Sequence, residues 1–441
     1  MHARRHIQER NAKDKVSKMP AIKLGLIGCG TRGVSHLLSL QASRRAHVVA
    51  VADLYDGHLQ RAREITAANP AAATQLFTRD YRQVLNRPDV DAVILAVPDF
   101  WQEKIFTAAV AAGKSVYCEA PFGQTIPAGE AMLAAAKKAG VTVQVGSGVP
   151  SSVACQQARE VFSDGRLGEI YFVDIVRDIG TSLGAWRAPY PPDASPESID
   201  WDAFQQAASR SLPFDLPRFF DWRCYWDYGS GVAGDALIDS LTAVQWIMNS
   251  VAPISVKAGG GNYRWHDGRE TPDIFQAEFE YPNFAMHLSC TMTTSKRGNK
   301  VSICGSSATL VLEDSRGVGF DSLRVLPEPE AEPYVSAVAS WAEQSRQWFY
   351  MMHGLDAAGR PSSGFPATLV EENWNNVADR DGTGNPDEDS LLPRHLGVFL
   401  AAVAGWRQVN EPASLGFDAA KLAHQADDAY RQVAGKHIDA R

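Results

Sequence analysis

The sequence predicts an α/β amino-terminal domain joined to an α+β carboxy-terminal domain. The chain has 441 residues, enough for two or three domains, and its 45% apolar and 21% charged residues are ordinary for a globular protein. Up to residue 147, short apolar runs alternate with segments of helical spacing, which is typical of a parallel sheet covered on both faces. From residue 148, long alternating runs follow one another closely and favour an antiparallel or mixed sheet. We therefore expect domains over residues 21–147 and 148–441.

The expected strands of the first domain are short and apolar, and a helix follows each strand but the last. These strands are expected at residues 22–30, 47–54, 91–98, 115–121 and 141–147, and the helices at 31–43, 55–69, 100–113 and 127–140. Strands without polar alternation are typical of a sheet buried on both faces.

The second domain is expected to begin with a helix and a strand and to continue, after a loop rich in Pro, Trp and Asp, with a helix and a run of strands. Helices are expected at 151–165 and 235–250, the loop at 183–201, and strands at 169–178, 254–265, 273–281, 284–295, 300–306 and 308–314. Residues 327–394 are rich in Pro, Gly and Asp, and we expect mostly loop there with one helix at 335–352. The segments 395–406 and 418–435 show helical spacing.

Charge and cysteine usage narrow the class of protein. The net charge is -8 with no long basic run, so nucleic acid is not an expected partner. The six cysteines form no CxxC pair and the eleven histidines no HxH or HExxH, so we expect no metal site and a reducing cytoplasm. Residues 1–20 are polar and basic without an apolar stretch, which predicts a disordered tail rather than a signal peptide. No run of about 18 apolar residues exists, so no membrane span is expected.

A glycine motif lies between the first expected strand and helix. Gly28, Gly30 and Gly33 form G-x-G-x-x-G, and Asp53 ends the second strand 20 residues later. This combination predicts a dinucleotide site in a Rossmann domain: a tight turn, close backbone approach to the pyrophosphate, and a carboxylate on the adenosine ribose. A carboxylate repels a 2′-phosphate, so NAD is favoured over NADP, although Arg32 could soften that preference. The expected cofactor contacts of the motif are Gly28, Gly30, Thr31, Arg32, Gly33 and Asp53.

Several further segments carry a resemblance to a known family. The strings "IGCGTRG", "VADLYD", "AVPDFWQ", "VYCEAPFG" and "WDYGSGVAGDALID" occur in this order, and over about residues 21–325 the chain resembles the Gfo/Idh/MocA oxidoreductases. The resemblance implies a Rossmann domain followed by a domain with a large open-faced mixed sheet, with ligands in the cleft between them. It also implies hydride transfer between NAD and a sugar, cyclitol or related alcohol. A homodimer or homotetramer through the open sheet face is implied as well.

The resemblance implies further cofactor contacts and one departure from the family pattern. The implied contacts are Val97, Pro98, Trp101, Glu119, Pro121 and Trp186. Glu119 and Pro121 match the ends of the family's E-K-P motif, but Ala120 replaces the lysine that assists proton transfer. At Gly148 and Val149, two polar side chains that face the substrate in the family are absent as well.

Other groups must then move the proton. Asp235 matches a family aspartate, and Asp239 stands where the family has its catalytic histidine. Four residues apart on a helix, the two share one face, and repulsion in a desolvated cleft would raise one pKa towards neutrality. The alternative is that both simply favour the first turn of a helix. A phenol, Tyr225, is a third candidate for proton transfer.

Aromatic and arginine side chains gather in residues 183–228 and suit a sugar-like ligand, since they offer ring faces and fixed hydrogen-bond donors. The expected substrate contacts are Arg187, Tyr190, Arg223 and Tyr228. The alternative for each aromatic is a place in the core or in a subunit contact.

Three functions remain open. The first is an NAD-dependent oxidoreductase acting at a secondary alcohol of a sugar, cyclitol or glycoside. The second is redox-neutral glycoside cleavage or epimerisation with tightly bound NAD. The third is a non-catalytic NAD-binding scaffold, which the combined losses at positions 120, 148, 149 and 239 would suit.

Overall fold

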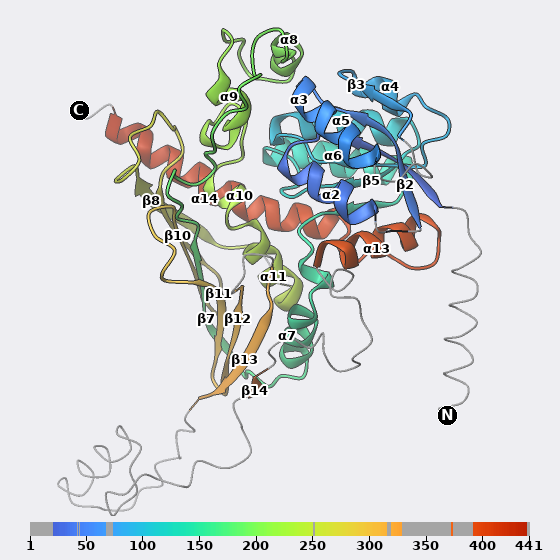
Figure 1. Cartoon of the computed structure of the whole chain (residues 1–441). Coiled ribbons are helices and arrows are strands. Elements are labelled where there is room, and N and C mark those ends of the chain that lie inside the picture. The colour runs from blue at the N-terminus through green and yellow to red at the C-terminus, as the bar shows by residue number, and fades with distance from the viewer. Residues whose placement is uncertain are drawn as a thin grey trace, which may run out of the picture.

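The structure is a computed structural model, and it describes residues 21–41, 43, 45–67, 74–249, 252–314, 319–328, 372–373 and 391–438. The expected tail at 1–20 and the expected helix at 335–352 lie outside the described residues. Figure 1 shows a helix-covered sheet on one side and a large second sheet on the other.

The first sheet has six strands in the order β3-β2-β1-β4-β5-β6, and every pairing is parallel. Its strands are β1 (Ile22–Ile27), β2 (Ala46–Ala52), β3 (Leu76–Thr78), β4 (Ala92–Leu95), β5 (Ser115–Cys118) and β6 (Val143–Val145). Its helices are α2 (Thr31–Gln41), α3 (Asp56–Ala67), α4 (Tyr81–Leu85), α5 (Asp99–Ala111) and α6 (Ile126–Ala139). The strand order reverses between β1 and β4, which opens a ligand crevice at their carboxyl ends.

The α/β prediction for this domain is confirmed, and two short elements were missed. Strand β3 has three residues, all half-buried, and helix α4 has five. Neither is long enough to show a hydrophobic period.

The second sheet has eight strands in the order β14-β13-β12-β11-β7-β10-β9-β8. Its strands are β7 (Ile170–Asp178), β8 (Ser255–Gly261), β9 (Ile274–Glu280), β10 (Ala285–Thr291), β11 (Asn299–Gly305), β12 (Ala308–Glu313), β13 (Ser322–Pro327) and β14 (Glu372–Asn373). The β7–β10 pairing is parallel and the remaining pairings are antiparallel, so the expected mixed sheet is confirmed.

One face of this sheet is open. Along β7, Val173 and Ile175 are fully buried, whereas Phe172 on the alternate face is 39% exposed. The buried face packs against helices of the same domain.

The remaining helical elements are η2 (Val149–Ser151), α7 (Val153–Ser163), α8 (Trp201–Gln205), α9 (Leu216–Phe220), η3 (Trp222–Cys224), α10 (Val232–Asp235), α11 (Ile238–Met248), α13 (Leu391–Val403) and α14 (Ala413–Ile438).

Several expected elements differ from the structure: the strand expected at 284–295 ends at Thr291, and strand β13 was not expected. The helix expected at 235–250 is divided into α10 and α11, so Asp235 ends one helix and Asp239 lies in the first turn of the next. The strand expected at 254–265 stops at Gly261, because the chain turns there and the Tyr263 amide donates to Asp273 instead of extending the ladder.

The last two helices return to the first domain. In Figure 1, α14 runs from the second sheet towards α13, which lies under the first domain. Helix α14 contacts α6 and β6 as well as α10, α11 and β8. From α13, Leu396, Phe399 and Leu400 join the apolar core that contains Leu37 and Tyr117.

Among the described residues, no helix is long and apolar enough to cross a membrane.

Candidate active site

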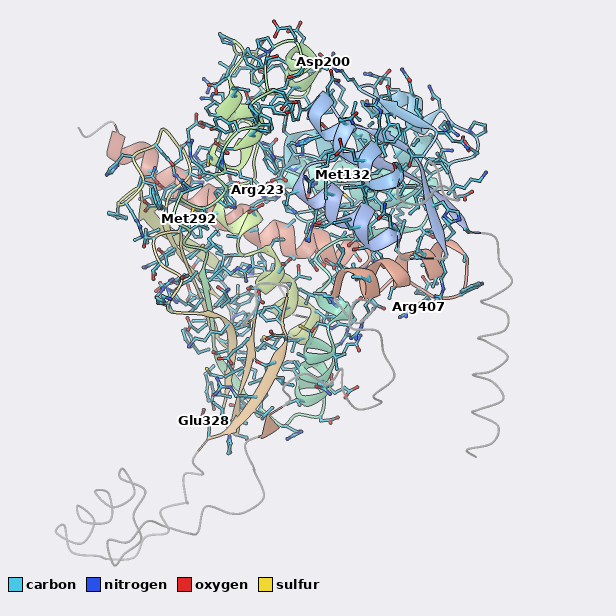
Figure 2. All side chains as sticks on the ribbon, in the orientation of Figure 1. Met132, Asp200, Arg223, Met292, Glu328 and Arg407 are labelled. Atoms are coloured by element: carbon cyan, nitrogen blue, oxygen red, sulfur yellow. The ribbon has the colours of Figure 1, made fainter. Side chains whose placement is uncertain are left out.

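A cavity of about 550 Å³ lies at the carboxyl ends of the parallel strands and is walled by both domains. The first domain supplies the loops after β1, β2, β4 and β5, and the second domain supplies α9, η3, α10 and α11. In Figure 2, Arg223 stands where the two domains meet. The lining includes the predicted residues Gly28, Gly30, Thr31, Arg32, Asp53, Val97, Pro98, Trp101, Glu119, Arg223, Asp235 and Asp239.

The glycine motif has the shape that a dinucleotide needs. Gly28 has a φ of +91°, and a Cβ atom there would lie 2.2 Å from the Ala96 carbonyl oxygen. A Cβ on Gly33 would lie 2.1 Å from the Gly28 carbonyl oxygen, so this glycine permits close packing of α2. At Gly30 the nearest atom would be 3.8 Å away, on His58, which leaves the backbone open to the cavity. The residues therefore fit a pyrophosphate at the amino terminus of α2.

Asp53 is held as an ionised carboxylate at the end of β2. It accepts hydrogen bonds from the Cys29 amide at 2.6 Å and the Tyr55 amide at 2.9 Å, and its Oδ1 lies 3.1 Å from Nδ1 of His58. Burial alone would raise the pKa of Asp53, but the His58 charge and these hydrogen bonds outweigh it, and the pKa is lowered. The carboxylate lines the cavity where the ribose of a dinucleotide lies in such folds.

Glu119 is bound on both oxygens. Arg32 Nε donates to Oε2 at 2.9 Å, and His36 Nε2 lies 2.5 Å from Oε1. Burial opposes ionisation of Glu119, but Arg32 and His36 outweigh burial and lower its pKa. Ala120 also lines the cavity. The Arg32 guanidinium, which comes from α2, therefore brings a positive charge beside Glu119, the residue that precedes Ala120.

Three carboxyl groups face the cavity from the domain junction. Asp99, at the first position of α5, is 3% exposed, accepts from the Ser230 amide at 2.9 Å, and has its pKa raised to about 7 by burial. Asp239 has its pKa raised to about 6, also by burial. Arg223 Nε donates to Asp235 Oδ1, so Asp235 is paired with a cation. Two carboxyl groups that titrate near neutrality thus lie in one cavity.

Other predicted residues do not line the cavity. Arg187 bonds to Asp221 and pairs with Asp267 at 2.8 Å, and the Tyr190 hydroxyl donates to Asp221 at 2.5 Å. These contacts hold the loop that carries Arg187 and Tyr190 against the segments that carry Asp221 and Asp267. Trp186, with a φ of 67°, and Pro121 and Gly33 are also outside the lining.

The phenols Tyr225 and Tyr228 do not line the cavity. Tyr225 is 6% exposed, and Tyr228 is fully buried with its hydroxyl accepting from Gln205 at 3.0 Å. Arg218 lies over both rings, 4.3 Å and 6.0 Å from their centres. Burial raises the pKa of both phenols. Tyr225 is therefore not positioned as the base, because its phenol is packed in the second domain.

Sequence reasoning gave no role to several residues of the lining. Asp99 lies, with Pro98 and Trp101, in the segment after the third expected strand that the resemblance places along the cofactor, but it was given no part in proton transfer. Trp222 lies in the aromatic segment expected near a ligand, and the other lining residues that sequence reasoning did not single out are Ile27, Ser35, Ala52, Leu54, His58, Arg79, Tyr81, Ala96, Ile105, Phe204, Phe219, Phe220 and Ile238. Phe219 and Phe220 come from α9, about 190 residues away in sequence from the glycine motif. No local pattern relates such distant segments.

Residues 193–220, which we call the strap, cross from the second domain to the loop after β2, beside Asp53. The Asp56 amide donates to the Ser198 carbonyl at 3.0 Å, and the Asp200 amide to the Leu54 carbonyl at 2.9 Å. The Tyr55 hydroxyl donates to Asp193 at 2.6 Å. The strap is thus fastened to the loop after β2, and its end supplies Phe219 and Phe220 to the cavity wall.

Two family models match the chain. The model described as "Oxidoreductase family, NAD-binding Rossmann fold" matches residues 22–147, and "GFO/IDH/MocA C-terminal domain" matches residues 203–311. Together they span more than half of the sequence.

Curated relatives match shorter stretches. Inositol 2-dehydrogenase of Klebsiella pneumoniae is 34% identical over 150 residues, which are 34% of this chain and 43% of that protein. Glycosyl hydrolase family 109 protein 2 of a Shewanella species is 32% identical over 114 residues, 25% of each protein. The chain spans less than half the length of these relatives. A solved structure of levoglucosan dehydrogenase, in complex with NADH and levoglucosan, has the same fold, with a TM-score of 0.63 and 15% sequence identity. The match covers 94% of this chain and 98% of that chain.

Proposed function

This chain belongs to the Gfo/Idh/MocA oxidoreductase family, and on that premise we propose that it is an NAD-dependent dehydrogenase acting at a secondary alcohol of a sugar, cyclitol or glycoside. One observation carries the proposal: a single cavity joins the Gly28–Gly33 motif to the carboxyl groups of Asp99, Asp235 and Asp239. The glycine motif suits a dinucleotide, and the carboxyl groups suit an alcohol that loses a proton. The names of the relatives, inositol 2-dehydrogenase and levoglucosan dehydrogenase, agree with this substrate class.

NAD, when bound, supplies the hydride acceptor. Gly28 and Gly30 would receive the pyrophosphate and Asp53 the adenosine ribose. Because the pKa of Asp53 is lowered, its negative charge disfavours the 2′-phosphate of NADP. Arg79, which also lines the cavity, is held by Asp56 through two hydrogen bonds of 2.9 Å and 2.6 Å and so is committed elsewhere. The preference for NAD over NADP follows from these charges.

Proton removal falls to Asp239 in this proposal. A pKa of about 6 leaves most of this carboxyl ionised at neutral pH, and such a group near the operating pH is an effective base. Asp99, with a pKa of about 7, is the second group able to accept a proton. Asp235 and Arg223 hold each other and orient the substrate. Arg32 supplies positive charge beside Glu119, where the family pattern has a lysine and this chain has Ala120.

The strap favours a second candidate, redox-neutral glycoside cleavage or epimerisation. Its bonds to the loop after β2 oppose exchange of a bound dinucleotide, and a retained cofactor suits a reaction that returns the hydride in each turnover. The match to a glycosyl hydrolase family 109 protein agrees with this candidate, although it covers 25% of the chain.

We also propose a homo-oligomer formed through the open face of the second sheet. Phe172 is 39% exposed in the single chain and lies on the open face of β7, which is an inner strand of that sheet. Apolar surface at such a position is typical of an interface. Sedimentation of the wild type beside Phe172→Asp tests this, since loss of the larger species in the variant is expected.

The experiment for the main proposal is turnover with added NAD. The purified protein is mixed with NAD or NADP and a panel of sugars and cyclitols, and nicotinamide absorbance is followed; Asp239→Asn is the catalytic control. A parallel reaction with glycosides and no added cofactor tests the second candidate. If calorimetry shows NAD binding but neither reaction proceeds with any substrate, the dehydrogenase proposal is wrong and the protein is a non-catalytic NAD-binding scaffold.

A further inference from the structure

His58 lies between the two parts of the candidate dinucleotide site. It comes from the first turn of α3, its side chain is 25% exposed, and it lines the cavity. Its Nδ1 lies 3.1 Å from Oδ1 of Asp53, and a Cβ atom on Gly30 would lie 3.8 Å from its Cε1. The imidazole ring therefore borders both the expected ribose carboxylate and the expected pyrophosphate loop.

The ring is held in one orientation. It makes edge-on contacts with Tyr55, with ring centres 4.9 Å apart, and with Phe220 of the strap, at 6.2 Å. Because Nδ1 faces the Asp53 carboxylate, Nδ1 carries the proton of the neutral ring and Nε2 has the lone pair. Within the described part of the chain, the hydrogen bonds of the His58 side chain involve Nδ1 alone. Nε2 is thus available to a ligand in the cavity.

Asp53 has little capacity left for a ribose. A carboxylate offers about four acceptor positions. The Cys29 amide takes one on Oδ2, and the Tyr55 amide and His58 take two on Oδ1. The remaining position suffices for one of the two hydroxyl groups of an adenosine ribose. The other hydroxyl needs a second acceptor, and Nε2 of the neutral His58 ring, on the same wall of the cavity, is able to supply it.

Protonation reverses the role of Nε2. The protonated nitrogen donates a hydrogen bond, and the ring then carries a positive charge. A 2′-phosphate accepts hydrogen bonds and has up to about two negative charges, so the protonated ring attracts it and offsets the charge of Asp53. Burial alone would lower the pKa of His58, but the charge of Asp53 and its hydrogen bond outweigh burial and raise the pKa. The protonated ring is therefore well populated at about pH 6.

The other groups around this ring do not change charge near neutral pH in the same way. The remaining charged groups that face it are Arg61 of α3 and Asp193 of the strap. Burial raises the pKa of the Tyr55 phenol and of the Cys29 thiol, so both stay neutral. The titrating group beside the expected ribose is thus the imidazole.

We propose that His58 is a cofactor-binding residue and that its charge sets how strongly the site prefers NAD to NADP. The neutral ring accepts a hydrogen bond from the 2′-hydroxyl of NAD, and the protonated ring donates one to the 2′-phosphate of NADP. The preference for NAD is thus weak in acid and strong in alkali. This inference rests on the dinucleotide site of the proposed function and adds to that site a residue and a pH dependence.

The test measures the affinities of NAD and NADP by calorimetry at about pH 6 and about pH 9. In the wild type, the ratio of the NAD affinity to the NADP affinity should increase about tenfold between these two pH values, which corresponds to a coupling of about one pKa unit between His58 and the phosphate. His58→Gln keeps a donor for Asp53 but cannot be charged, so its ratio should be high at both pH values. His58→Lys carries a charge at both, so its ratio should be low at both.

Two controls isolate the effect of His58. The change that remains in His58→Gln measures the second ionisation of the 2′-phosphate, with a pKa of about 6, together with the titration of Asp99 and Asp239 at the domain junction. His287→Gln is the matched variant, because His287 of β10 is paired with Asp174 at 3.0 Å but does not line the cavity. It should behave like the wild type.

The outcomes separate this inference from the dehydrogenase proposal. The expected ratios without turnover of any substrate would keep the inference and overturn the dehydrogenase. NAD binding with the same change of ratio in the wild type and in His58→Gln would overturn the inference and leave the dehydrogenase standing. A ratio in His58→Lys no lower than in His58→Gln would overturn the inference as well. Binding of neither dinucleotide to the wild type would overturn both.

Discussion

Nε of Arg32 lies 2.9 Å from Oε2 of Glu119, although 87 residues separate them in sequence. The pair places a guanidinium beside the strand end where the family pattern has a lysine and this chain has Ala120. Negative charge on Glu119 raises the pKa of Arg32, so the cation is permanent. The relationship suggests how the chain keeps a positive charge at the reacting end of the cavity.

Replacing Arg32 should slow the reaction. Arg32→Gln removes this charge, and loss of a single charged or donating group that stabilises a transition state typically lowers kcat/KM by about 10²- to 10³-fold. The double variant Arg32→Gln with Ala120→Lys should recover part of the loss, because it returns a cation from the motif position. Steady-state kinetics with saturating NAD measures both. A loss confined to NAD affinity, with no recovery in the double variant, would show that Arg32 serves only the cofactor phosphates.

The pH dependence of the reaction should report Asp239. A base must be ionised, so kcat/KM should rise with pH through about 6, the pKa to which burial raises this carboxyl. Asp239→Asn should lower kcat/KM by about 10²- to 10⁴-fold and remove that limb from the residual activity. If the variant keeps full activity and the limb has its midpoint near 7, Asp99 is the base instead.

Loosening the strap should speed release of the cofactor. Tyr55→Phe removes the hydroxyl that donates to Asp193 at 2.6 Å while keeping the buried ring. One such hydrogen bond contributes about 0.5–1.5 kcal/mol, so the NADH dissociation rate should increase about 2- to 12-fold. Stopped-flow NADH fluorescence measures the rate, with Glu130→Gln, an exposed position on α6 outside the strap, as the control. An unchanged rate would mean that the strap does not retain the dinucleotide.

Asp427 should make the protein less stable as pH rises. This α14 carboxyl accepts from the Ala233 and Gly234 amides, and burial raises its pKa to about 8 from 3.8. Between those values the folded state holds a proton that the unfolded state has released, so stability falls as pH increases through that window.

The Asp427→Asn variant should flatten this dependence. The free energy of unfolding, measured with urea, should fall by about 1–4 kcal/mol between about pH 5 and about pH 8 in the wild type, but not in the variant. The neighbouring Asp428→Asn, at a side chain 59% exposed, should behave like the wild type. The same pH dependence of the free energy of unfolding in all three proteins would contradict the assignment of this effect to Asp427.

Local pattern was enough to predict the parallel sheet, the mixed sheet and the dinucleotide motif, because each depends on residues close in sequence. It could not predict the bond between Arg32 and Glu119, nor the aromatic wall from Phe219 and Phe220, since these join segments far apart. The substrate contacts expected of Arg187 and Tyr190 followed from residue type alone. In the structure both side chains are bound to Asp221, which composition cannot reveal. The roles of the predicted site residues stay predictions until the variants are measured.

The return of α13 and α14 to the first domain has a consequence for synthesis. The segments that build the nucleotide-binding sheet leave the ribosome early, but the core around Leu37 and Tyr117 stays uncovered until Leu396 and Phe399 have been translated. A chain that ends prematurely would display this apolar surface, and chaperones and proteases recognise such surfaces. The order of translation thus delays closure of the first domain until α13 has been made.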